Sequence, residues 1–378
     1  MGTLAYSTGS SSRLWEGVTT RQRKVRSDKA GLLKIRDGMI ALGRAAGMLK
    51  ERTLPGMTPK PRATLVACLL FVAIAAVLRL MVGGDGLAFP DSNDVLGLRA
   101  HRLLAAGVVG GSLSLAGVML QSLLRNPLAS PDLIGLGPGA GFGVMLATYL
   151  HYLSTGELTR WTGVGGPALL GALAALGIVY AISQRRGIID PAAMILIGVV
   201  VGLVFGAGTV FLQVQMPDRG QSALRWLMGS ISDETSGGQL TLCAAVLLIA
   251  MTLTSAGGRV LDACAMSEDE ARTVGVPVGV VRAALFVGAG VLSAASIMLA
   301  GPIAFVGLIA PHVVRMLGGP GHRMLAINAT IAGAALVIGA DALVKGIDLA
   351  SGRMPIGVLT AALGGPFFLV LLVGGRGR

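Results

Sequence analysis

Apolar runs of about twenty residues recur along most of this chain, and they limit its fold more than any other feature. Two of these runs, residues 103–120 and 133–150, flank a short polar stretch with two prolines, residues 121–131. Hydrophobic residues make up 53% of the sequence and charged residues 13%, a balance that no soluble domain of 378 residues needs for its core. The strands of a membrane barrel would alternate apolar and polar residues, whereas these runs are continuous. The sequence therefore predicts an all-α polytopic membrane protein.

The runs predict about ten membrane-spanning helices. Basic residues concentrate in alternate loops and at both ends of the chain, which places both termini in the cytoplasm under the positive-inside rule. The same rule accounts for the net charge of +12 without a nucleic-acid partner. Basic residues on the predicted outer side need another reason, and these are Arg219, Arg225, Lys345 and Arg353. The expected spans are about 63–82, 100–122, 133–152, 164–183, 191–214, 239–256, 280–300, 302–317, 324–343 and 355–374.

Residues 1–60 differ in composition from the rest of the chain, because they are polar and basic. Such a segment buries too little apolar surface to fold alone, so we predict a cytoplasmic extension that is partly disordered. Within it, residues 31–50 alternate apolar and basic side chains, which is typical either of an amphipathic helix on the membrane surface or of a poorly ordered tail. Residues 61–378 then form the membrane domain.

Glycine is frequent in several expected spans. The second span carries Gly107, Gly110, Gly111 and Gly117, a set of small residues that suits close packing of helices. The third span opens with a glycine-rich stretch, 135–143, onto which a loose dinucleotide-binding fingerprint can be threaded. That stretch neither follows a strand nor sits in a βαβ unit, so we interpret it as helix packing.

The most charged segment beyond the N-terminal extension is 259–279, which the topology places on the cytoplasmic side. A short helix from Ser267 to Val274 fits the capping and dipole rules, because the serine can cap its start and acidic residues fill its first turn. Gly275 would end this helix. We interpret the segment as a handle for a partner protein.

Few residues in the sequence point to chemistry. No phosphate-binding loop of the form Gly-x-x-x-x-Gly-Lys-Ser/Thr occurs, so the chain cannot hold ATP by that device. The histidines are scattered and the cysteines lack metal-ligand spacing, so we predict no metal and no cofactor bound by this chain. Asp341 is the main ionisable candidate within a span for a proton- or ion-driven carrier. An ATP-independent secondary carrier or an integral membrane enzyme is the alternative function.

Several blocks of sequence follow one another between residues 63 and 374: LRAHR at 98–102, AGVMLQ at 116–121, RNPLASP at 125–131, WLMGS at 226–230, AGPIAFVGLIAPHVVR at 300–315, HR at 322–323, GAD at 339–341 and PIGVLTAALGGPF at 355–367. Together they resemble the FecCD or BtuC type of permease, found in ATP-binding-cassette (ABC) importers for ferric siderophores, haem and cobalamin. The motif residues that carry over are Gln121, Asn126, Pro127, Pro131, Gly307, Pro311, His312, Arg315, Asp341, Pro355 and Gly357.

The resemblance implies a BtuC-like importer permease fold and a set of partners: a second permease copy or paralogue, cytoplasmic ATPases that hold ATP and magnesium, and an external or periplasmic solute-binding protein. Membrane lipid surrounds the chain, and no nucleic acid is expected. Docking to the solute-binding protein falls on Arg99, Arg102 and Lys345. Coupling to the ATPase falls on Ser267, Glu268, Ala271, Arg272 and Gly275. The chain departs from the family pattern at His101, Ser267 and Arg353.

By this resemblance the chain is not an enzyme but a permease subunit in the bacterial cytoplasmic (inner) membrane. It would translocate a ferric siderophore, or a related iron chelate, haem or cobalamin, driven by ATP hydrolysis on partner subunits. We expect a path lined by small and apolar side chains. For residues 121–131 we expect a rigid inner turn that positions the second and third spans, with direct ATPase contact as the alternative.

Overall fold

The computed structural model describes residues 61–83, 92–155, 164–185, 188–216, 226–231, 235–265, 268–273, 275–319, 321–346 and 354–375. The chain divides into two compact units, Thr58–Gly364 and a smaller one made of Met1–Met57 with Gly365–Arg378. In the smaller unit only the second part of the last helix is described. The predicted N-terminal extension, 1–60, and its amphipathic helix at 31–50 lie outside the described residues.

Each predicted span coincides with a helix, which confirms the all-α class. Within the described residues, seven helices are long and apolar enough to cross a membrane, while α12 and α14 contribute shorter apolar stretches, and α4 has the length of a span. The helices that coincide with the predicted spans are α2 Pro61–Met81, α3 Asn93–Leu123, α4 Leu136–Thr155, α5 Gly165–Ser183, α6 Pro191–Val214, α8 Gly237–Ala256, α11 Val278–Ala300, α12 Val306–Gly318, α13 His322–Gly346 and α14 Ile356–Gly375. The short elements are η1 Pro131–Ile134, α9 Gly258–Cys264, α10 Glu268–Thr273 and a hairpin of β1 Gln184–Arg185 with β2 Ile188–Ile189.

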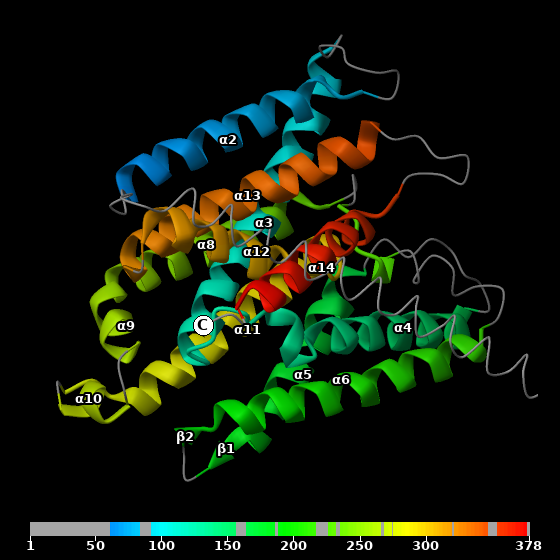
Figure 1. Ribbon diagram of the computed structural model, residues 1–378. Coiled ribbons are helices and arrows are strands. Elements are labelled where there is room, and N and C mark those ends of the chain that lie inside the picture. Colours follow the sequence, from blue (N-terminus) through cyan, green and yellow to red (C-terminus); the bar gives the residue numbers. More distant parts are fainter. Residues whose placement is uncertain are drawn as a thin grey trace, which may run out of the picture. The chain divides into compact units, whose positions relative to one another are not determined.

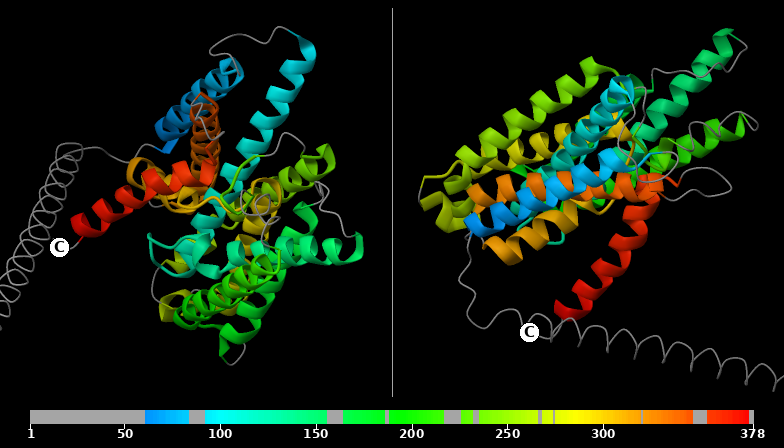
Figure 2. Two further views of the ribbon diagram at one scale, coloured as in Figure 1. Left: turned by 90° about the vertical axis from the view of Figure 1, so that its right-hand side faces the viewer. Right: turned by 90° about the horizontal axis from the view of Figure 1, so that it is seen from above.

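The helices of the larger unit pack in two groups joined by α11. In the first group α13 packs against both α2 and α3 (Figure 1), and α2 and α13 lie side by side again in the view from above (Figure 2). In the second group α4, α5 and α6 pack against one another, and α11 contacts both α3 and α5. The most apolar windows of α3 and α11 are 78% and 72% buried, so these two helices form the centre of the unit.

Several helices keep large apolar side chains exposed. The most apolar windows of α2, α6 and α8 are each only 22% buried. Side chains exposed on α6 include Leu196, Leu203, Val204, Phe211 and Val214. Such continuous apolar surface is stable only against lipid or another protein, which agrees with a multi-pass membrane protein.

Small residues allow the central helices to approach closely, as the sequence predicts. A Cβ atom added to Gly110 would overlap the backbone of Gly333 on α13, and one added to Gly117 would overlap the backbone of Gly307 on α12. The glycines of the third span act in the same way, because Gly139 packs against the backbone of Gly171 on α5. These contacts confirm the packing interpretation of the glycine-rich stretch.

Some boundaries differ from the prediction for local reasons. Helix α3 begins well before residue 100, because Ser92 caps it through a hydrogen bond from the Val95 amide to Oγ at 3.4 Å. The start of the third expected span is the 3-10 helix η1 instead, with Pro131 at its first position. Gly135 then takes a left-handed backbone, with φ of +75°, and separates η1 from α4.

Candidate functional site

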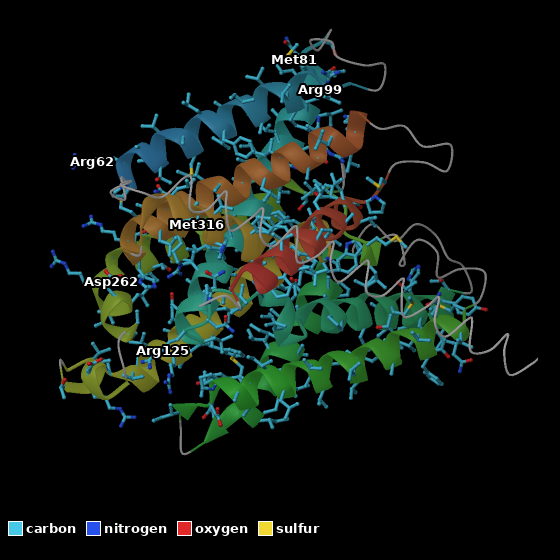
Figure 3. All side chains as sticks on the ribbon, in the orientation of Figure 1. Arg62, Met81, Arg99, Arg125, Asp262 and Met316 are labelled. Atoms are coloured by element: carbon cyan, nitrogen blue, oxygen red, sulfur yellow. The ribbon has the colours of Figure 1, made fainter. Side chains whose placement is uncertain are left out.

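Charged residues gather at two opposite ends of the larger unit. Arg62, Arg125 and Asp262 lie at one end, whereas Arg99 lies at the other, beside Met81 (Figure 3). We call these the Arg125 end and the Arg99 end. The predicted topology assigns the Arg125 end to the cytoplasm and the Arg99 end to the outside.

At the Arg99 end, two arginines and one carboxylate from three helices are buried together, and we call them the Arg–Asp cluster. Arg102 of α3 donates to Asp341 of α13 through Nη2 at 2.8 Å and through Nε at 3.1 Å. Arg79, in the last turn of α2, also donates from Nε to Asp341. The side chains of Arg79 and Asp341 are fully buried, and that of Arg102 is 9% exposed. The cluster therefore joins α2, α3 and α13.

The Arg–Asp cluster holds two positive charges against one negative charge. Nη1 and Nη2 of Arg79 have no hydrogen-bond partner among the residues that the structure describes. A buried charge is tolerated only when a partner compensates it, and Asp341 supplies a compensating charge to both arginines. The sequence predicted separate roles for Arg102 and Asp341, and it predicted none for Arg79. Its pairing with Asp341 could have been predicted, because ionisable residues in membrane spans usually pair. Arg79 lies near the outer end of one span and Asp341 near the outer end of another.

The residues predicted to dock a solute-binding protein lie at one end, but they differ in exposure. Arg99 is partly buried, and its Nη1 donates to the Leu80 carbonyl oxygen at 2.6 Å. Lys345 lies in the last turn of α13, one turn beyond Asp341. The guanidinium of Arg102 is committed to Asp341, so it could reach a partner only if that pair opened. The docking role of all three residues stays a prediction.

The helix predicted for the charged cytoplasmic segment forms as α10. The Gly275 amide donates to the Arg272 carbonyl at 2.9 Å, and the Val276 amide donates to the Ala271 carbonyl at 3.0 Å. This pair of hydrogen bonds ends a helix on a residue with a left-handed backbone, and Gly275 has φ of +85°. The predicted helix stop is thus confirmed. Ala271 is fully buried and Arg272 is exposed.

Other parts of the coupling prediction are not described by the structure. Ser267, the expected cap, lies outside the described residues, and so does the side chain of Glu268, although its backbone begins α10. Contact of Ser267, Glu268, Ala271, Arg272 and Gly275 with an ATPase stays a prediction.

The polar stretch between α3 and α4 forms a compact turn. The Asn126 amide donates to the Gln121 carbonyl at 3.1 Å, and Asn126 Oδ1 accepts from the Leu128 amide at 2.9 Å. Pro127 lies between these two bonds, and the turn leads into Pro131 of η1. This hydrogen bonding agrees with the expected rigid turn.

Arg125 links that turn to the segment before α10. Its backbone is left-handed, with φ of 49°, and its Nε donates to the Cys264 carbonyl oxygen at 2.9 Å. Burial raises the pKa of the Cys264 thiol above its ordinary value, and the charges of Arg125 and Arg282 oppose that shift. The turn therefore contacts α9, which precedes the coupling helix, a connection that the sequence did not reveal.

Three segments that carry the family resemblance meet near the start of α14. The Ser230 amide donates to the Ala300 carbonyl at 2.8 Å, and the Gly357 amide donates to the Gly229 carbonyl at 3.2 Å. Pro355 directly precedes α14. Phe305, next in this region, has φ of +68° and donates its amide to Asp132 Oδ2 at 3.4 Å. The motif spacing alone could not predict this convergence.

Further motif residues lie on α12 and at the start of α13. Gly307 packs against the Leu113 carbonyl of α3, where an added Cβ would approach to 2.7 Å. Pro311 and His312 lie inside α12, and Arg315 lies in its last turn. His322 pairs with Asp262 of α9, with Nδ1 at 2.6 Å and the amide at 2.9 Å from the same carboxylate oxygen.

The described residues contain no group of three or more histidine, cysteine, aspartate or glutamate side chains that could hold a metal ion. The fold and these contacts define the class of protein as a polytopic helical membrane protein with charged residues at both ends of its helices. The chain belongs to the FecCD transport family, which matches residues 63–374.

Curated relatives agree with this family over most of the chain. The cobalamin import system permease protein BtuC of Halobacterium salinarum is 33% identical over 305 residues, covering 80% of this chain and 78% of the relative. The vitamin B12 import system permease protein BtuC of Klebsiella pneumoniae is 31% identical over 345 residues, covering 90% and 99%. The chain is therefore a transport permease of the ABC-importer class.

A solved structure supports the same fold. It is described as an inward-facing conformation of an ABC transporter assigned to the metal-chelate type. This chain matches it with a TM-score of 0.70 and 29% sequence identity, over 83% of this chain and 99% of that one. The similarity confirms the expected importer permease fold.

Proposed function

We propose that this chain is the membrane permease of a binding-protein-dependent ABC importer that carries a bulky metal chelate across the bacterial cytoplasmic membrane. The observation that carries the proposal is the FecCD match over residues 63–374, together with relatives named as import permeases. ATP and magnesium would bind to separate ATPase subunits, and the chain itself would open alternately to the two sides of the membrane.

The two charged ends support an assignment of partners. At the Arg99 end, Arg99 and Lys345 would pair with acidic residues of a solute-binding protein, since charges at the edge of an interface steer docking and fix its orientation. At the Arg125 end, α10 would fit against the ATPase. The exposed apolar side chains of α6 would face either lipid or a second permease copy or paralogue.

The cargo we expect is a ferric siderophore or a related iron chelate, haem included. Cobalamin is the second candidate, because both curated relatives are named for it. Either cargo is large and arrives already bound to a carrier protein, so a path of small and apolar side chains suits it better than a deep polar site.

Uptake into proteoliposomes tests the proposal. The chain would be reconstituted with its ATPase and solute-binding protein and given radiolabelled ferric siderophores, haem and cobalamin separately. Accumulation of a ferric chelate, with none of cobalamin, would support the iron assignment. Accumulation of cobalamin alone would replace that cargo while leaving the importer function intact, and uptake of no chelate would refute the function.

A docking experiment tests the partner assignments. Arg99→Glu with Lys345→Glu should weaken binding of the solute-binding protein at least tenfold, and Arg62→Glu, at the opposite end, serves as the matched control. Arg102→Glu is a poor test, because it would place a second carboxylate against Asp341. Glu268→Arg should weaken ATPase binding, measured in detergent by pull-down with the purified ATPase. Unchanged binding in both variants would contradict these roles.

A further inference from the structure

A cavity of about 220 Å³ lies at the Arg125 end and has no assigned role. It is bordered by the turn after α3, the segment that follows α9, the last turn of α12 and the first turn of α13. Its lining residues are Gln121, Ser122, Arg125, Pro127, Ala265, Arg315 and His322. No sequence motif for ligand binding predicted it, because the lining comes from separate parts of the chain.

The lining of this cavity is basic. It includes two guanidinium groups, those of Arg125 and Arg315, and no aspartate or glutamate is among the described residues that line it. The carboxylate of Asp262 is engaged by the amide and ring of His322, and Asp262 is not a lining residue. The cavity therefore carries positive charge without a carboxylate of its own.

Buried polar atoms in the lining lack partners. Nε of Arg315 is buried and has no hydrogen-bond partner among the described residues. Gln121 is only 3% exposed, and its Oε1 is likewise without a partner in the described part of the chain. The Gln121 Nε2 reaches the Ala129 carbonyl only at 3.5 Å. Buried polar groups are normally satisfied, so the unpaired donor Arg315 Nε points to an acceptor ligand. Gln121 Oε1 is itself an acceptor, and it would be satisfied by the hydroxyl of a protonated phosphate.

The two arginines come from distant parts of the chain, because Arg125 follows α3 and Arg315 lies in the last turn of α12. Each has N–H donors to offer. Arg125 is fixed by the bond from its Nε to the Cys264 carbonyl at 2.9 Å, which leaves its terminal nitrogens for another acceptor. A guanidinium presents a planar fork of donors that matches the oxygens of phosphate, and two such groups make a strong oxyanion site.

We propose that this cavity binds an oxyanion of the phosphate class through Arg125 and Arg315, with Gln121 and His322 at its border. The volume holds the equivalent of about seven water molecules, at about 30 Å³ each, which leaves room for a phosphate group. The phosphate is either free in solution or part of an anionic lipid headgroup, since basic pockets between membrane helices bind such headgroups. This inference does not depend on the cargo or on the importer mechanism.

Binding to the purified full-length chain tests the site. The chain in uncharged detergent would be titrated with inorganic phosphate by calorimetry, at constant ionic strength with chloride as the reference anion. In a parallel arm the chain would be placed in nanodiscs of phosphatidylcholine with or without phosphatidylglycerol, and its thermal unfolding measured. Arg315→Gln should weaken binding at least tenfold for whichever of the two ligands, phosphate or phosphatidylglycerol, binds to the wild-type chain. Arg62 is an exposed arginine at the same end, so Arg62→Gln removes the same charge. This control should change neither phosphate binding nor the effect of phosphatidylglycerol on thermal unfolding.

The outcomes separate the two sources. Saturable phosphate binding that Arg315→Gln abolishes assigns free oxyanion, whereas a rise in melting temperature with phosphatidylglycerol alone, lost in Arg315→Gln, assigns the lipid headgroup. If Arg315→Gln does not fold, Arg125→Gln replaces it. No binding in either arm, or equal losses in Arg315→Gln and Arg62→Gln, would overturn the proposal. So would loss of ATPase binding in Arg315→Gln with no anion effect, because the cavity would then accept an acidic side chain of the ATPase.

Discussion

At the scale of single residues, the Arg–Asp cluster carries the largest concentration of buried charge in the described part of the chain. Asp341 accepts hydrogen bonds from Arg79 and Arg102 at once, so its loss removes the carboxylate that both buried guanidinium groups contact. The sequence identified Asp341 as an ionisable residue in a span, but it suggested ion coupling. The partners of that carboxylate became visible only when the fold brought α2, α3 and α13 together.

Asp341→Asn should lower the free energy of unfolding by about 3–5 kcal/mol, because it removes the charge that compensates two buried arginines. Urea unfolding of the detergent-purified chain would measure the change. Asp94→Asn is the matched control, since Asp94 is exposed in the first turn of α3 and its loss should cost less than about 1 kcal/mol. Equal stability of both variants would show that the cluster is not a structural link.

At the scale of elements, the sequence predicted the position of every long helix, because a run of apolar residues needs little context to become a span. It predicted the glycine stop of α10 from capping rules alone. It could not predict the bond from Arg125 to Cys264, the pairing of His322 with Asp262, or the strained backbone at Phe305. Those features depend on which helix ends contact one another in the folded protein. The spacing of residues along the sequence does not determine these contacts.

Close helix packing gives a prediction with an internal control. Gly117→Ala should destabilise the chain by about 1–3 kcal/mol, because the new methyl group would overlap the Gly307 backbone. Gly339→Ala, on α13, should be tolerated, since nothing lies within 4 Å of its added Cβ. The measurement is the melting temperature of each variant. A Gly117→Ala protein as stable as Gly339→Ala would contradict the close contact between Gly117 and the Gly307 backbone.

The end of the coupling helix gives another prediction. Gly275→Ala should strain the left-handed backbone at φ of +85° by about 1–2 kcal/mol, although no neighbouring atom would clash with the methyl group. Amide hydrogen exchange in α10 should therefore become about 5–30 times faster. Gly275→Asn should have a smaller effect, because asparagine tolerates this conformation. Identical exchange in wild type and Gly275→Ala would show that the glycine is dispensable.

At the scale of the whole molecule, charge and apolar surface divide the chain's contacts into three kinds. In the proposed function, the Arg99 end would offer basic residues to a solute-binding protein, the Arg125 end would offer α10 to an ATPase, and the exposed apolar helices would face lipid or a second permease. Loop charges predicted which end is cytoplasmic, whereas the docking residues of the Arg99 end came from the family resemblance. The cargo is not encoded in any cluster of polar residues that the sequence or the described structure reveals, so transport must identify it.

ATP-dependent uptake is the most direct measurement of the central claim. Proteoliposomes that contain this chain, its ATPase and the solute-binding protein would be given a labelled ferric chelate, with ATP or with a non-hydrolysable analogue inside. We predict accumulation with ATP only, and its loss when the ATPase carries an inactivating substitution. Equal uptake with and without hydrolysis would contradict the account and favour an ATP-independent secondary carrier.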